Sequence, residues 1–272
     1  VITHFKPLEI GTSVERLREL GYGLDCYGKP LVDDNQILEL KPQDIVLPAC
    51  PESPEEGADE ILFRTTKFLD DLLVKLYGVK AFYKLKSTKD LAGHLVNALA
   101  PHTSSSVVAR IVGFSKTQGF LAHPMLHAAT RRDCDGDEAS VTLLLDTLLN
   151  FSRQFLPNTR GATQDASLVL TSRVIPSEVD DMVFDVDVVW KYPLSFYEAA
   201  LAYKGPWEVE IEQLGKRLNT PAQYEGMGFT HGISNINEGV MCSAYKTLPS
   251  MQEKLQGQMD LADRIRAVDE AD

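Results

Sequence analysis

The chain has 272 residues, of which 44% are hydrophobic and 24% are charged, and its formal net charge at pH 7 is −12. This composition is ordinary for a soluble globular protein, and the length allows one large domain or two smaller ones. No apolar stretch reaches the roughly 20 residues that a membrane span needs, and no leader marks the chain for secretion. The chain begins with Val and ends in a charged helical run, which predicts a piece of a longer protein.

The acidic charge argues against a general nucleic-acid-binding surface, because neutralising phosphates requires Lys and Arg. However, the acids are concentrated in a few segments, and a locally basic stretch lies between them: Arg110, Lys116, Arg131 and Arg132. The four cysteines are scattered and form no CxxC pair. They predict unbridged thiols in a reducing cytoplasm rather than a zinc site.

The first predicted element is a helix that Thr12 or Ser13 caps and that a glycine ends after about two turns. A short extended run follows at 44–47. The apolar spacing over 58–77 predicts one long helix. A Ser-Thr-Lys-Asp sequence resembles a capping box and predicts a further helix over 87–99.

The middle of the chain begins with a β-branched apolar run over 107–114, which predicts a strand. The segment 120–138 is dense in His, Pro, Arg and Asp and is predicted to consist mostly of loops. One apolar face over 141–155 predicts a helix that ends at Pro157. A second strand is predicted over 166–174.

The last part of the chain is predicted to be mostly helical. The expected helices are 194–203, 207–218 and 251–268, with strands at 226–233 and 240–245.

The residues that can carry chemistry are concentrated in one segment, 131–138, which reads Arg-Arg-Asp-Cys-Asp-Gly-Asp-Glu. Carboxylates this close together repel one another unless a cation neutralises them. Their hard oxygen atoms suit Mg²⁺, Mn²⁺ or Ca²⁺ rather than zinc. Gly136 allows a sharp turn, so that Asp135 and Asp137 can point at the same place.

An acidic loop of this kind has two other interpretations. An EF-hand is excluded, because glycine falls between the second and third Asp and the twelfth position is Leu144. A solvated acidic turn at the start of a helix near Glu138 remains open, since acids favour the positive end of a helix dipole.

The context of the acidic loop favours the metal site. Residues 122–129, which contain a His-Pro pair, lead into Asp133–Asp137, and this order resembles the active-site stretch of multisubunit RNA polymerases. The whole chain is similar to part of the large subunit of the archaeal family D DNA polymerase. The blocks that carry this resemblance are Thr3–Pro7, Leu99–Ser104, Arg110–Phe114, Ala122–Pro124, Cys134–Glu138, Leu148–Ser152, Tyr192–Leu194 and Arg264–Asp269.

The resemblance implies an α+β fold with a double-psi β-barrel catalytic core and surrounding helices, part of a larger two-barrel subunit. It divides the chain into three segments. Residues 1–86 would be a mixed segment that helps to complete the barrel, and 87–190 would hold the barrel region with the acidic loop and its following helix. Residues 191–272 would be mostly helical.

The family's metal ligands fall on Asp135 and Asp137, which would hold Mg²⁺ or Mn²⁺ for nucleotidyl transfer. Two ions about 4 Å apart can activate a primer hydroxyl and hold a triphosphate. Family D usually has Asn where this chain has Asp133, so Asp133 is either a third ligand or a solvated side chain. Arg131 and Arg132 would contact phosphates or the incoming nucleotide, or else pair with the neighbouring acids.

Further residues are candidates for contacts near this site. His123 and His127 have the spacing of a helical metal pair, but Pro124 argues against a regular helix there, which favours structural hydrogen bonds. His102 lies in a loop that could approach the site. The candidates for DNA or nucleotide contact are Lys6, Arg110, Lys116 and His123.

The resemblance also implies partners. These are primer–template DNA, deoxynucleoside triphosphates, the rest of the large subunit with its second barrel, a small subunit with the proofreading nuclease, and a sliding clamp bound through regions outside the chain. The expected location is the cytoplasm of an archaeal cell, at the nucleoid and away from membranes. The rival interpretations are a metal-dependent phosphoesterase or nuclease, and a non-catalytic DNA-binding or structural piece when the chain is isolated.

Overall fold

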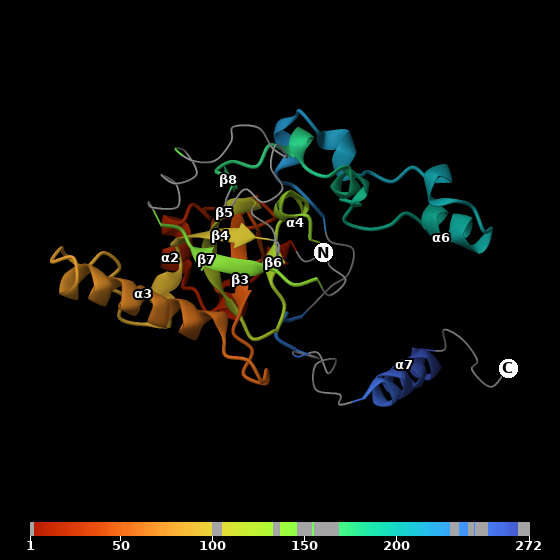
Figure 1. The fold of residues 1–272 in the computed structure, drawn as a ribbon. Helices are drawn as coiled ribbons and strands as arrows, with labels where there is room; N and C mark the ends of the chain where they lie inside the picture. The colour runs from red at the N-terminus through yellow and green to blue at the C-terminus, as the bar shows by residue number, and fades with distance from the viewer. Residues whose placement is uncertain are drawn as a thin grey trace.

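The structure is a computed structural model that describes residues 3–99, 105–132, 137–145, 154, 169–228, 234–238, 242 and 250–265. Its centre is a mixed β-sheet surrounded by helices, whereas α6 and α7 stand away from the sheet (Figure 1). The helices are α1 (Pro7–Ile10), α2 (Val14–Glu19), α3 (Ala58–Lys75), α4 (Pro124–Thr130), α6 (Leu194–Leu201) and α7 (Met251–Ile265).

The strands are β1 (His4–Phe5), β2 (Leu38–Glu39), β3 (Asp44–Pro48), β4 (Leu95–Leu99), β5 (Ser105–Ser115), β6 (Leu121–Ala122), β7 (Ser140–Leu143) and β8 (Val169–Thr171). Short 3₁₀ turns occur at Thr88–Leu91, Pro176–Glu178, Asp181–Asp185, Pro206–Glu208, Leu214–Arg217 and Pro221–Gln223. The chain therefore has the mixed α+β composition that the sequence predicts.

The main sheet has six strands in the order β6-β3-β5-β4-β7, and β8 pairs with β5 beside this path. The long central strand β5 pairs with β8 through its first residues and with β3 through its last residues, both in parallel. The pairs β3–β6, β4–β5 and β4–β7 are antiparallel. Strands β1 and β2 form a separate antiparallel pair.

Two hydrophobic cores lie on opposite faces of β3 and β5. Ile45 and Leu47 pack in one core with β4, β7 and α4, whereas Val46 packs in the other with Val112, α1 and α2. This division follows from the alternation of side chains along a strand. Because both faces are covered, these strands read as continuous apolar runs in the sequence.

The helices α1 and α2 cover the second core. Ser13 is the N-cap of α2 and accepts a hydrogen bond from the Arg16 backbone N–H at 3.2 Å, as the sequence predicts. Helix α1 approaches β5 so closely that a Cβ atom on Gly113 would lie 2.6 Å from the Ile10 carbonyl oxygen. Only glycine fits at this position.

Several other predicted elements are confirmed. The extended run 44–47 is β3, the helix 58–77 is α3, and the strand 107–114 is the greater part of β5. The helix 194–203 is α6, and α7 accounts for the described part of the helix 251–268. The strand 166–174 is confirmed in its centre as β8.

The prediction of a helix over 87–99 is wrong. Ser87 and Asp90 do form the predicted capping box, but it caps only the 3₁₀ turn Thr88–Leu91. Residues 95–99 are strand β4, which pairs with both β5 and β7. The cap is a local signal, and pairing in the sheet overrides it one turn later.

The segment 120–138 is not mostly loop, because it contains β6 and α4. Pro124 occupies the first turn of α4, where its missing N–H costs nothing, so it begins the helix that it was expected to prevent. The predicted helix 141–155 is also wrong at its start, because Ser140–Leu143 is β7. Apart from Gln154, its part beyond residue 145 lies outside the described residues.

The predicted helix 207–218 consists instead of two 3₁₀ turns, Pro206–Glu208 and Leu214–Arg217. Between these turns, Gln213 forms an antiparallel bridge with Asp187. The predicted strand 226–233 is absent from its described residues, 226–228, and 240–245 is described only at Cys242. Within the described residues, no helix is both long and apolar enough to cross a membrane.

Candidate functional site

In the sequence, the acidic loop falls between α4 and β7, and β7 begins at one end of the main sheet. Ser140, the first residue of β7, pairs with Leu99 at the end of β4, and Val169 of β8 pairs with Ser105 at the start of β5. The described ends of four strands therefore meet here.

The two described ends of the acidic loop are joined by an ion pair. Arg132 Nη1 lies 3.5 Å from Asp137 Oδ2, and the two side chains are 28% and 38% exposed. Arg131 ends α4 in the left-handed backbone region, with φ 55°, and its side chain is exposed. For Arg132, the structure thus provides the pairing with a neighbouring acid that the sequence suggested as one alternative.

Of the three candidate metal ligands, the structure describes Asp137 alone. Asp137 is a partly exposed carboxylate, and its 3.5 Å separation from Arg132 is longer than a close charge-assisted hydrogen bond. Asp133, Asp135 and Gly136 lie outside the described residues. Among the residues that are described, no three His, Cys, Asp or Glu side chains gather into a possible metal site.

The two histidines of α4 have structural contacts. His123 is the N-cap of α4, and its Nδ1 accepts the Met125 backbone N–H at 3.1 Å. Burial lowers the pKa of His123 to about 4, and the Tyr224 backbone acts in the opposite direction. Burial also lowers the pKa of His127, whose ring packs edge-on against Phe120 at 5.4 Å. Both rings are therefore neutral near pH 7, and His102 lies outside the described residues.

Arg110 is part of an inner polar network rather than a surface patch. Its Nε and Nη2 donate to the two carboxylate oxygens of Asp44 at 2.8 and 2.7 Å, and the Tyr22 hydroxyl donates to Asp44 Oδ2 at 2.6 Å. The Asp44 hydrogen bond raises the pKa of Arg110, and burial followed by the Asp44 charge raises that of Tyr22. The guanidinium fork of Arg110 is thus occupied inside the fold.

Lys6 and Lys116 lie near the segment 234–238. The Lys6 ammonium donates to the Ser234 carbonyl, and the Lys116 backbone N–H donates to Asn237 Oδ1 at 2.7 Å. The Lys116 side chain is exposed. Lys116 follows the last residue of β5, about 33 Å along the strand from the end where β4 finishes and β7 begins. The structure therefore does not bring Lys116 together with Arg132.

Asn97 is a buried polar residue that the sequence reasoning missed. Its side chain has no exposed surface, and within the described residues neither polar atom of its amide has a hydrogen bond. It lies on β4 opposite Thr142 of β7, the strand that follows the acidic loop. The sequence signal for this residue is an amide side chain inside the otherwise apolar run 95–99. A buried amide without a hydrogen bond requires an explanation.

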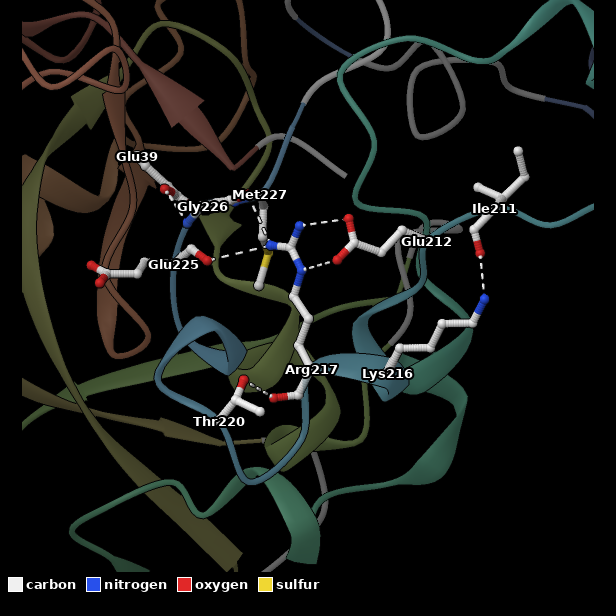
Figure 2. Close-up of polar contacts among 9 residues, drawn as sticks. All are labelled: Glu39, Ile211, Glu212, Lys216, Arg217, Thr220, Glu225, Gly226 and Met227. Atoms are coloured by element: carbon white, nitrogen blue, oxygen red, sulfur yellow. Dashed lines mark hydrogen bonds and ion pairs between the residues drawn. The ribbon is translucent and has the colours of Figure 1, made fainter.

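A second polar cluster joins residues 212–227 to strand β2 (Figure 2). Arg217 binds both carboxylate oxygens of Glu212, at 2.8 and 3.0 Å, and donates to the Gly226 carbonyl at 2.8 Å. Glu39 of β2 accepts the backbone N–H groups of Gly226 and Met227, each at 2.9 Å. Burial raises the pKa of Glu39. These contacts position residues 212–227 and lie outside the acidic-loop region.

Comparison with known proteins gives a consistent result. Residues 1–254 match the family described as DNA polymerase II large subunit DP2, catalytic domain. The chain is 54% identical over its whole length to the DNA polymerase II large subunit of Archaeoglobus fulgidus, and 54% identical over 99% of its length to that of Pyrococcus furiosus. The corresponding protein of Methanothermobacter thermautotrophicus is 48% identical. The chain spans 21–24% of the length of these relatives.

Proposed function

The chain belongs to the catalytic-domain family of the DNA polymerase II large subunits, and on that premise we propose that it carries the metal-binding half of a DNA polymerase active site. The reaction would be template-directed transfer of a nucleotide from a deoxynucleoside triphosphate to a primer 3′ hydroxyl in archaeal DNA replication. The observation that carries this proposal is the family match over residues 1–254, which includes the entire acidic loop.

Asp135 and Asp137 would hold the catalytic Mg²⁺, or Mn²⁺, with Asp133 as a possible third ligand from the same loop. The bound ion would neutralise charge on the phosphates and favour the ionised primer hydroxyl. Arg132 keeps Asp137 near the start of the loop through a weak contact, which can be exchanged for a stronger one when substrate arrives. Arg131 and Arg132 would then donate to phosphate oxygens, for which the planar guanidinium is well suited.

The fold proposed for this site is the double-psi β-barrel. The parallel pairing of β3 with β5 supports a barrel that is completed by residues 1–86, because it joins that segment to the region 87–190. The division into 1–86, 87–190 and 191–272 is part of the same proposal. A second barrel, from the remainder of the large subunit, would supply further basic residues.

The assembled enzyme would act on primer–template DNA with a proofreading small subunit and a sliding clamp, at the nucleoid in the cytoplasm. The chain by itself is proposed to be inactive, because part of the site lies elsewhere in the polypeptide. A phosphoesterase would need additional His or Asp ligands near the acidic loop, and the described residues provide no such cluster.

Primer extension by the assembled polymerase tests this proposal. We expect Asp135→Ala and Asp137→Ala each to reduce the extension rate by a factor of at least about 100, because charge stabilisation in the transition state is lost. The folded state should be unaffected, since Asp137 is exposed. Asp71→Ala is the matched control, because it removes an exposed carboxylate from a surface ion pair with Lys75.

The wild-type extension rate in either loop variant would refute the metal assignment. Release of phosphate from a simple ester by the isolated chain would favour the phosphoesterase. Extension by the isolated chain would show that the second barrel is not needed.

A further inference from the structure

Two cysteines that are distant in the sequence approach each other at the end of the sheet where β3 and β5 finish. Cys50 follows β3 and is 6% exposed. The preceding residue, Ala49, donates its backbone N–H to the Ser115 carbonyl at 2.8 Å, so Cys50 lies beside the turn that follows β5. That turn contains Gln118.

Cys242 reaches the same turn from the C-terminal part of the chain. Its Sγ lies 3.5 Å from Gln118 Oε1, to which it donates a hydrogen bond. The Cys50 side chain, through its charge and its hydrogen-bonding, also raises the pKa of the Cys242 thiol. The Gln118 contact of Cys242 and the pairing of Ala49 with Ser115 bring both cysteines to the turn after β5. Both residues are thiols rather than a disulfide in this structure.

We propose that Cys50 and Cys242 form a redox pair that a low-molecular-weight disulfide converts into an intramolecular disulfide bond. The product would link the end of β3 covalently to the segment that precedes α7. This inference rests on the contacts of the two thiols and is independent of the proposed polymerase function.

The chemistry is ordinary thiol–disulfide exchange. The Cys242 thiolate attacks one sulfur of the reagent, forms a mixed disulfide and releases one thiolate. The Cys50 thiol then loses its proton and attacks Cys242 Sγ, which forms the Cys50–Cys242 bond and releases the second thiolate. The two protons from the protein end on the two reagent thiols, so the protein loses two electrons and the reagent gains them.

The environment of Cys242 sets the pH dependence of this reaction. Burial, and then the nearby Cys50, raise the pKa of the Cys242 thiol. Because the thiolate is the nucleophile, exchange should be slow near pH 7 and should accelerate as the pH rises. Glu52 and Glu55 act on the pKa in the same direction.

Cys26 provides a matched control within the same chain. It lies in a turn where its backbone N–H donates to the Ile37 carbonyl at 2.8 Å. Burial raises the pKa of Cys26 to about 11, and the charged side chains that act on it are Asp25 and Glu39. Among the described residues, no second cysteine acts on Cys26.

The test is oxidation of the 272-residue chain with oxidised glutathione at pH 7 and pH 9, followed by thiol titration in denaturant. We expect the thiol count to fall from four to two, faster at pH 9, with a mass loss of two hydrogens per chain. Peptide mapping without reductant should recover one linked peptide pair, which contains Cys50 and Cys242.

Cys26→Ser should leave this reaction unchanged, whereas Cys50→Ser and Cys242→Ser should abolish the linked pair. Cys50→Ala replaces Cys50→Ser if the buried hydroxyl prevents folding, and the wild-type peptide map decides the question without any variant. Retention of all four thiols in the folded protein, or a link between any other two cysteines, would overturn the proposal.

Discussion

The inner polar network and helix α4 differ in the charge state of their buried ionisable side chains. In the network, Asp44 is 5% exposed and remains compatible with burial because Arg110 and Tyr22 supply three hydrogen bonds to its carboxylate. At the start of α4, His123 is fully buried, and burial lowers its pKa far below the usual value. The inner polar network therefore buries two opposite charges as a pair. Helix α4 buries neutral histidines, and its charged side chain, Arg131, lies at its exposed C-terminal end.

This difference indicates which arginine is available for function. Arg110 and Arg132 belong to the same basic stretch of the sequence, but only Arg110 makes a bidentate contact with a buried partner. A buried charge that loses its partner is strongly destabilising, whereas an exposed ion pair contributes little. The structure therefore assigns Arg110 to stability and leaves Arg132 able to change partners.

The largest expected effect comes from breaking the inner pair. Asp44→Asn removes the charge opposite Arg110 and should lower the free energy of unfolding by about 3–5 kcal/mol, because the guanidinium stays largely buried. Urea denaturation at pH 7 measures the loss. Asp71→Asn, in an exposed pair with Lys75, is the control and should change stability by about 0.5 kcal/mol or less. Equal losses in both variants would contradict the comparison.

The second effect concerns the buried neutral histidine. The pKa of His123 in the folded state, about 4, lies below its ordinary value of 6.5, so the folded state binds fewer protons than the unfolded state. Its contribution to stability is complete above pH 6.5 and is lost as the pH falls toward 4, by up to about 3 kcal/mol.

His123→Asn isolates this contribution, because asparagine can cap α4 through the same backbone N–H but does not titrate. Urea denaturation of both proteins from pH 7 to pH 4 should show the smaller loss in the variant. The additional loss in the free energy of unfolding of the wild type should approach about 3 kcal/mol. His4, whose pKa is also lowered to about 4 by burial, remains in both proteins and cancels in the difference. Parallel pH profiles would show that His123 is not buried in the neutral form.

A third, smaller effect is expected from Tyr22→Phe. This change removes the hydroxyl that donates to Asp44 at 2.6 Å but leaves the Arg110 pair intact. A hydrogen bond to a charged group contributes about 1.5–3 kcal/mol, so the loss should be smaller than for Asp44→Asn. Calorimetric unfolding of the two variants side by side checks the order. A loss larger than that of Asp44→Asn would mean that the tyrosine, not the arginine, stabilises the carboxylate.

The sequence predicts the inner network poorly because its members are far apart in the chain. Tyr22, Asp44 and Arg110 are joined only when β3 and β5 pair, and no local pattern encodes that register. By contrast, Ser13 caps α2 as predicted, because a cap depends on residues within one turn. The same reason explains the failure at 95–99, where the sheet imposes a strand after a genuine helix cap.

The sequence predicts which types of residue form the candidate site, but it does not predict how the surrounding elements are arranged. The acidic loop stands out in the sequence because its carboxylates are crowded, and Asp137 indeed lies at an accessible position. Pro124 was misread, since the same residue can break a helix or begin one, and only the position of the N-cap decides. Asn97 could not be identified as buried and unpaired until β4 was placed between β5 and β7.

The smallest expected effect on stability, and the sharpest test of the comparison, is Arg132→Ala. Its contact with Asp137 is long and both side chains are about a third exposed, so stability should change by about 0.5 kcal/mol or less. If Arg132 turns to a phosphate oxygen during catalysis, the loss of a charge-assisted hydrogen bond should lower kcat/KM for primer extension by roughly 10- to 100-fold in the assembled polymerase. Arg64→Ala, which breaks another surface pair, with Glu56, should leave both quantities unchanged. A loss of stability without a loss of extension would place Arg132 with Arg110, as a structural arginine, and would remove the distinction between the two regions.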